Sequence, residues 1–273
     1  MRAMNSTKHL ESWRADDRVM PSHWWTAHFR ANRERDWQIP WDVDVPALGE
    51  AARKRIAFSI AEFQRGESSE ARNYLAKSES FSGRTGDPHF HAASVLFVRE
   101  ENGHSALLLR FMQLAGIAPI KASWGDRVFR WLRSVGDIGW ASRVLIIAEL
   151  IAQDYYPALR ASTQHPILVR ICDKVIFDEE AHIQFQVERI VRAEAARGFL
   201  SVRVRHVAQT LLMLGAACVV LAGHRRVLVP TIGAWKFLAC SLRRNRRALD
   251  AIRVLRRERA RLQEDGKVRI ATG

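Results

Sequence analysis

Two short segments of the chain each place a glutamate three residues before a histidine. They are Glu101 to His104 and Glu179 to His182, and both lie in stretches whose apolar residues recur with helical spacing. Because positions i and i+3 share one face of a helix, each segment directs a carboxylate and an imidazole toward the same point. Each segment therefore supplies half of a metal site.

Each half has a matching glutamate upstream. Glu67 lies 34 positions before the glutamate of the first segment, and Glu149 lies 30 positions before that of the second. A tyrosine follows each upstream glutamate by seven residues, namely Tyr74 and Tyr156. One Glu-x-x-His segment is common by chance, but two copies with matching companions indicate an internal duplication that builds a site.

The periodicity of apolar residues predicts the helices that position these side chains. The predicted helices are 47–77, 88–116, 139–160 and 166–197, with a loop at 78–87 and a connection of about twenty residues at 117–138. If the apolar stripes of the four helices face one another, six side chains converge. These are Glu67, Glu101, His104, Glu149, Glu179 and His182.

Four carboxylates inside a helical core require a strong positive partner, because burying an unpaired charge costs several kcal/mol. Two divalent cations supply that charge. Carboxylate and imidazole ligands without thiolate suit iron, manganese or a mixed pair of the two better than structural zinc. The three cysteines, Cys172, Cys218 and Cys240, lack metal-ligand spacing and are predicted to be buried thiols.

One Glu from each of two helices combined with Glu-x-x-His from each of two others resembles the ferritin-like di-iron carboxylate superfamily. The resemblance covers about residues 50–197. It implies an all-α, ferritin-like four-helix bundle with one long crossover and two bound iron ions. It also implies these roles: Glu101 and Glu179 bridge or chelate, His104 and His182 each cap one iron, Glu67 and Glu149 are terminal carboxylates, and Tyr74 is a redox or supporting group.

Four further residues are candidates for neighbouring roles. Glu70 lies one turn from Glu67 and is an additional or alternative ligand from the first helix. Asp178 and Gln153 are candidates for orienting the ligand histidines, as residues behind metal ligands usually do. Tyr156 stabilises a radical, hydrogen-bonds a ligand or packs in the aromatic core.

The bundle is predicted to span 46–198, between an irregular Trp-rich arm at 1–45 and a basic helical extension at 199–273. The net charge of +14 resides almost wholly in the extension, since residues 197–273 hold 17 Lys and Arg against 4 Asp and Glu. Within it, 207–223 is almost entirely apolar. This stretch is either a fifth core helix or an anchor at a membrane surface.

These patterns predict an enzyme that uses two iron ions to activate O2 and oxidise a largely apolar organic substrate inside the bundle, beside Phe63, Phe97 and Leu108. The expected partners are O2, that substrate and an electron-donor protein, and we expect a homodimer. The alternatives are a ferroxidase or iron-handling protein, and a protein that binds an anionic membrane surface or nucleic acid through its basic C-terminal helices. Nucleic-acid binding has no motif beyond the arginine runs.

The first 18 residues are polar and charged, so no signal peptide is expected. The predicted location is therefore the cytoplasm, with peripheral association to an anionic membrane as the alternative.

Overall fold

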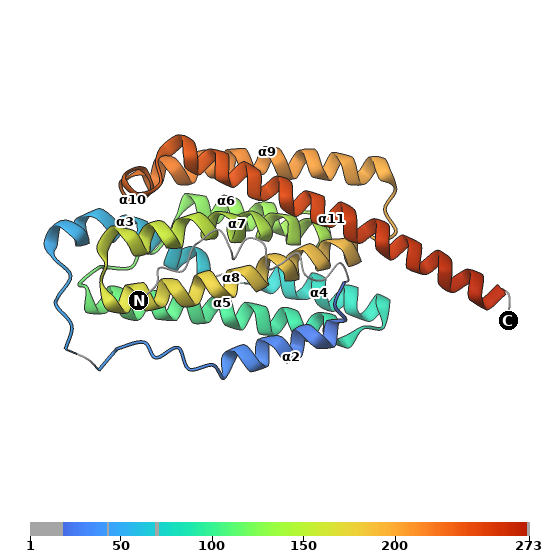
Figure 1. Cartoon of the computed structure of the whole chain (residues 1–273), viewed down its shortest axis with the longest axis horizontal. Coiled ribbons are helices and arrows are strands. Elements are labelled where there is room, and N and C mark those ends of the chain that lie inside the picture. The colour runs from blue at the N-terminus through green and yellow to red at the C-terminus, as the bar shows by residue number, and fades with distance from the viewer. Residues whose placement is uncertain (1–18, 43, 69–70, 272–273) are drawn as a thin grey trace, which may run out of the picture.

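A computed structural model describes residues 19–42, 44–68 and 71–271 of the chain. Over these residues the protein is all-α and contains no strand, as the sequence predicts. Figure 1 shows the arrangement of the helices. They are α2 (Ser22–Arg33), α3 (Glu50–Glu67), α4 (Arg72–Thr85), α5 (Pro88–Leu114), α6 (Trp124–Ser134), α7 (Ile138–Thr163), α8 (Pro166–Ala193), α9 (Phe199–Gly223), α10 (Arg225–Thr231) and α11 (Ala234–Ala271).

The four helices that carry the predicted ligands pack in a closed cycle. Helix α3 contacts α5, α5 contacts α8, α8 contacts α7, and α7 contacts α3. Apolar side chains such as Ile60, Leu108, Leu150 and Val175 fill the space between them and are fully or almost fully buried. The short helix α6 lies in the connection between α5 and α7, where the sequence predicted a crossover.

The first predicted helix is in fact two helices. Helix α3 ends at Glu67, and α4 occupies most of the stretch predicted as a loop. Gly66 and Ser68 favour this break because both have low helix propensity, and the Ser68 hydroxyl donates to the carbonyl of Arg65 at 2.8 Å. Helix α4 ends at Gly86, whose φ of +67° suits glycine. Tyr74 therefore lies on α4 and not on the helix of Glu67.

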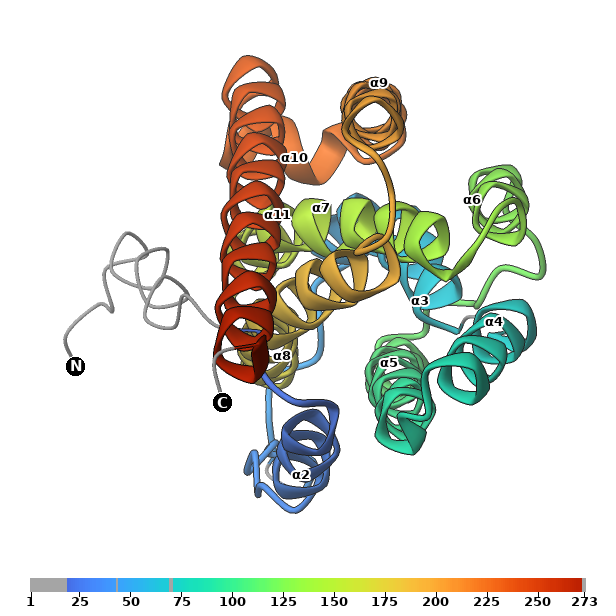
Figure 2. The same ribbon diagram turned by 90° about the vertical axis from the view of Figure 1, so that its right-hand side faces the viewer.

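The N-terminal arm is also more ordered than predicted, because Ser22–Arg33 forms helix α2. This helix packs along α5 (Figures 1 and 2). Trp25 is buried, and its Nε1 donates to Glu188 Oε2 at 2.8 Å. The prediction of an irregular arm is thus wrong for this segment, and Trp13 of the arm lies outside the described residues.

Helices α9 and α11 form an outer layer over α7 and α8 (Figure 2). Buried polar side chains join this layer to the core: Arg143 of α7 bonds Glu194 and Gln209. Among the described residues, α9 is the one helix long and apolar enough to cross a membrane. That property is weak evidence by itself, because core helices of soluble proteins share it.

Candidate metal centre

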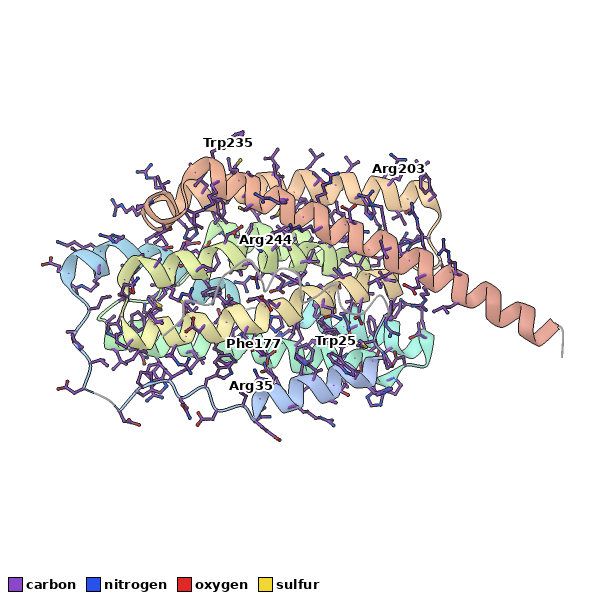
Figure 3. The ribbon with its side chains drawn as sticks, viewed as in Figure 1. Trp25, Arg35, Phe177, Arg203, Trp235 and Arg244 are labelled. Atoms are coloured by element: carbon purple, nitrogen blue, oxygen red, sulfur yellow. The ribbon has the colours of Figure 1, made fainter. Side chains whose placement is uncertain are left out.

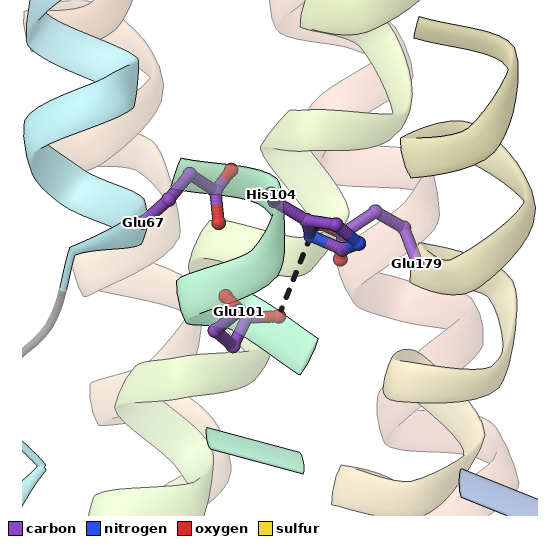
Figure 4. Close-up of side chains that lie close together, drawn as sticks. All are labelled: Glu67, Glu101, His104 and Glu179. Atoms are coloured by element: carbon purple, nitrogen blue, oxygen red, sulfur yellow. Dashed lines mark ion pairs between the residues drawn. The ribbon is translucent and has the colours of Figure 1, made fainter. Parts of the chain in front are cut away.

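The six side chains predicted as ligands converge inside the four-helix cycle. Glu67 comes from the last turn of α3 and Glu149 from α7, while the two Glu-x-x-His segments lie on α5 and α8. Figure 4 shows Glu67, Glu101, His104 and Glu179 directed toward one another. We call the six residues together the Glu/His cluster.

The Glu/His cluster contains two overlapping sets of candidate ligand atoms, and within each set the atoms lie within 4.8 Å of one another. One set is Glu67, Glu101, His104 and Glu179, and the other is Glu101, Glu149, Glu179 and His182. Glu101 and Glu179 belong to both sets. The two shared carboxylates are therefore placed to bridge a pair of ions, and each set adds one further carboxylate and one imidazole.

The cluster leaves four buried polar atoms without a hydrogen-bond partner: Glu101 Oε1, His104 Nδ1, Glu179 Oε2 and His182 Nδ1. His182 Nδ1 lies 2.8 Å from Glu101 Oε1, yet the two atoms do not have the orientation of a hydrogen bond. An unpaired buried polar atom costs roughly 1–3 kcal/mol. Cations bound among these atoms would satisfy all four, so the residues present fit a metal centre.

Burial and mutual repulsion shift the pKa values of the carboxylates in the cluster. Burial, reinforced by the charge of Glu149, raises the pKa of Glu179 well above its ordinary value. Burial and the charge of Glu101 also raise the pKa of Glu67. Burial acts in the same direction on Glu149, but its close contacts with Glu179 and His182 outweigh burial and lower the pKa of Glu149. Protein groups alone thus do not keep all four carboxylates ionised, whereas divalent cations would.

Each ligand histidine is oriented by the acidic residue that precedes the glutamate of the other segment. His104 Nε2 lies 2.8 Å from Asp178 Oδ2, and His182 Nε2 lies 2.9 Å from Glu100 Oε2. These partners assign the ring proton to Nε2 and leave Nδ1, which faces the cluster, free to bind a metal. Lys174 adds an ion pair to Asp178. Its charge and the bonds with His104 outweigh burial and lower the pKa of Asp178.

A single amide from α2 joins the two orienting acids. Asn32 Nδ2 donates to Glu100 Oε1 at 2.6 Å and to Asp178 Oδ1 at 2.7 Å. The sequence analysis identified neither Asn32 nor Glu100. Glu100 has a local signal, since an acid precedes the glutamate in both segments. Asn32 has none, because it lies 68 residues from Glu100 along the chain.

The other predicted site residues take different positions. The Tyr156 hydroxyl donates to Glu67 Oε1 at 2.5 Å, and burial raises the pKa of Tyr156 so far that it stays protonated. The ring of Tyr74 packs edge-on against Phe97. Gln153 donates to the carbonyl of Ile176 at 3.3 Å, so its expected role of orienting a histidine is not observed. Glu70 lies outside the described residues.

A cavity of about 430 Å³ leads from the Glu/His cluster toward α6 and α9. All four glutamates of the cluster line one end of it. Phe63 and Phe97 line its wall as predicted, whereas Leu108 lies in the core between the helices. The remaining lining is largely apolar, so the cavity can hold a largely apolar molecule next to the cluster.

Comparison of the chain with known protein families, with characterised proteins and with solved structures finds no match. The assignment of function therefore depends on the arrangement of the chain's own residues.

Proposed function

We propose that this protein is a di-iron carboxylate oxidoreductase with a ferritin-like bundle, which activates O2 to oxidise an apolar organic substrate. The observation that carries the proposal is the pair of ligand sets that share Glu101 and Glu179. The closed cycle of α3, α5, α8 and α7, with the crossover helix α6, agrees with the bundle that holds such sites in the ferritin-like class.

The residues of the cluster have separate tasks in this proposal. Glu101 and Glu179 would bridge two iron ions, with Glu67 and His104 on one ion and Glu149 and His182 on the other. When bound, the two ions supply the electrons that reduce O2. Each ligand set would surround its ion with three carboxylates and one imidazole.

The residues behind the ligands hold protons and fix geometry. Asp178 and Glu100 keep the proton of each imidazole on Nε2, and Asn32 keeps these two acids in place. The Tyr156 hydroxyl stabilises one oxygen of Glu67 and remains a neutral donor. The apolar cavity wall excludes bulk water from the face of the cluster where the substrate would lie.

Two observations favour organic oxidation over iron storage. The cavity beside the cluster has a largely apolar lining, which suits a carbon-rich substrate more than hydrated Fe²⁺. The net charge of +14 also repels cations and does not help the protein gather them. Repeated turnover would then require an external electron donor, such as a redox protein.

Anaerobic loading of the full chain with Fe²⁺ tests the proposal. We expect the chain to bind about two iron ions and to form no iron mineral. After exposure to O2, Mössbauer spectroscopy should show that both ions have been oxidised. Glu101→Ala should abolish this behaviour, while the matched variant Glu79→Ala, at an exposed position of α4, should retain it. A wild-type chain that binds no iron or manganese would contradict the proposal, and growth of a mineral core would favour a ferroxidase.

A further inference from the structure

Helix α6 presents its apolar side to solvent. Trp124, Val128 and Trp131 follow one another at steps of four and three residues, so they form one stripe on the helix, and Val135 comes directly after its last residue. All four are exposed, with 45–63% of their surface accessible. The polar side chain of Arg133 is buried instead. This orientation is the reverse of that expected for a surface helix of a water-soluble protein.

Helix α9 also presents apolar side chains to solvent, in addition to the apolar side chains that it buries. An outward stripe runs along it through Leu200, Val204, Val207, Leu211 and Leu214, whose exposed fractions are 43–75%. Only 17% of the most apolar stretch of α9 is buried, which argues against a core helix. We call these five residues and the four of α6 the α6–α9 face.

Two polar residues of α9, Gln209 and Arg205, bond to the body of the protein. Gln209 is fully buried, accepts from Arg143 at 2.7 Å and donates to Asn245 at 2.8 Å. Arg205 pairs with Asp137 and Glu194, both at 3.0 Å. These bonds hold α9 flat on the layer beneath it. An apolar outward stripe on a helix held in this way fits one that lies in a membrane surface rather than one that crosses it.

The charge around the α6–α9 face suits anionic lipid. Residues 195–249 contain ten Lys and Arg and no Asp or Glu. Arg203 near the start of α9, Arg225 and Arg226 after its end, and Lys236 are all exposed. Figure 3 shows Arg203 and Trp235 projecting from the same edge of the molecule, and Trp235 is 82% exposed. Exposed Trp and Arg beside an apolar stripe are typical of helices at a lipid headgroup boundary.

The mouth of the cavity lies within this face. Trp124 and Val128 of α6 and Leu211 and Val219 of α9 line the cavity and are also exposed. Figure 2 shows α6 and α9 on the side of the molecule opposite α2. The cavity therefore connects the outward apolar side chains with the Glu/His cluster in the interior.

We propose that the α6–α9 face docks on an anionic bilayer and that the cavity takes its substrate, a lipid-soluble molecule with an extended apolar chain, directly from that bilayer. The docking step stands on the exposed side chains and the surrounding charge alone. The identity of the cavity's occupant as a substrate rests on the proposed di-iron function.

Flotation of the full chain with vesicles tests the docking step without added metal. We expect the protein to float with vesicles of equal parts phosphatidylcholine and phosphatidylglycerol, and at least tenfold less with phosphatidylcholine alone. Leu211→Glu and Trp131→Glu should each reduce partitioning at least tenfold. Leu114→Glu is the matched control, because Leu114, at the end of α5, is an equally exposed leucine that is not part of the α6–α9 face. It should leave partitioning within twofold.

The same variants distinguish docking on a bilayer from dimerisation through the α6–α9 face. If the α6–α9 face were covered in a dimer, Leu211→Glu would convert a dimer to a monomer in sedimentation, and the wild type would not float. That pair of results would overturn the proposal. Circular dichroism and thermal melting of each variant show whether the fold is retained.

Quenching of tryptophan fluorescence by brominated phosphatidylglycerol is an independent measure of docking. The brominated lipid should quench the fluorescence of the wild type more than that of Trp124→Phe/Trp131→Phe.

The cavity step is tested with the fluorescent fatty acid cis-parinaric acid. Ala148 lines the cavity, so Ala148→Phe should weaken binding of the probe at least tenfold while flotation stays within twofold of wild type. Ala106→Phe, on the exposed side of α5, should bind the probe as the wild type does. Equal binding by the wild type and Ala148→Phe would contradict entry of a lipid chain into the cavity. Because neither experiment uses iron, their failure is distinguishable from failure of the di-iron proposal, which iron loading tests.

Discussion

Among the described residues, the Glu/His cluster and the buried group around Arg143 differ in how their polar atoms are satisfied. Between α7 and the outer layer, Arg143 donates twice to Glu194 and once to Gln209, and Gln209 in turn donates to Asn245. In the Glu/His cluster, by contrast, two glutamates and two histidines each retain an atom without a partner. Burial of charge therefore does not by itself mark a functional site. Four unpaired atoms gathered among carboxylates and imidazoles that form two sets of candidate ligands do so, because together they can hold a cation that the chain does not provide.

Removing a shared ligand should have the largest effect. Glu179→Ala deletes a carboxylate that belongs to both ligand sets. We therefore expect the metal content to fall from about two ions per chain to near zero. This fall corresponds to a loss in metal affinity of at least about a thousandfold, or ~4 kcal/mol. Elemental analysis after gel filtration measures this. In the presence of a chelator, the variant should melt no lower than the wild type, because an unsatisfied buried carboxylate has been removed. Retention of both ions would contradict the shared-ligand arrangement.

The Arg143 cluster should behave in the opposite way. Arg143→Met leaves Glu194 buried with only Arg205 as its cationic partner, and should lower the free energy of unfolding by about 3–5 kcal/mol. Urea unfolding measures this loss, and iron stoichiometry should not change. Arg143→Met/Glu194→Leu removes both charges and should recover most of the stability. A loss below about 1 kcal/mol in the single variant would show that the pair contributes little.

Glu188 is an intermediate case, a buried carboxylate that has hydrogen-bond donors but no close counter-ion. Burial is the main cause that raises its pKa to about 7 from the model-peptide value of 4.5. The folded state therefore binds more protons than the unfolded state between these values, and stability should fall as pH rises from about 4.5 to about 7.

The contribution of Glu188 to stability is fully present below pH 4.5 and lost above about 7, with an upper magnitude of about 3 kcal/mol. The free energy of unfolding of the wild type and of Glu188→Gln can be measured in urea across this pH range, with a chelator present. The difference between the two proteins at each pH gives the contribution of Glu188. The curve for Glu188→Gln should be flatter, and parallel curves would contradict the raised pKa. Glu79→Gln serves as an exposed control.

Asn32 should have the smallest of these effects, because it acts through the acids that orient the histidines. Asn32→Leu removes the amide shared by Glu100 and Asp178 and should weaken metal binding about 10- to 100-fold. Competition with a chromophoric chelator measures the change. Arg30→Ala, at an exposed position of the same helix, should bind metal with wild-type affinity. Equal affinity in Asn32→Leu would show that α2 does not support the centre.

Much of the fold follows from local pattern. The helices α5, α7 and α8 lie within a few residues of their predicted bounds, since long apolar stripes with caps at Asp87 and Asp137 define them. The prediction fails where propensity is weak, at the break after Glu67, and where an element depends on long-range packing. Helix α2 is such an element, because Trp25 and Asn32 are buried against α5 and α8. The local sequence of the arm does not predict this packing.

By itself, the sequence determined the four residues of the two Glu-x-x-His segments, because the i and i+3 spacing of Glu and His fixes their shared helix face within one turn. Glu67 and Glu149 followed from their matched positions upstream of these segments, with Glu70 left as an alternative to Glu67. Only the tertiary structure decided the crossed pairing of each histidine with the acid of the other segment, and the amide of Asn32 that links them. It also decided that the apolar stripes of α6 and α9 face outward around the cavity. These features depend on how distant helices rotate and pack against one another, and the periodicity of a single helix is the same whichever way its apolar side finally points.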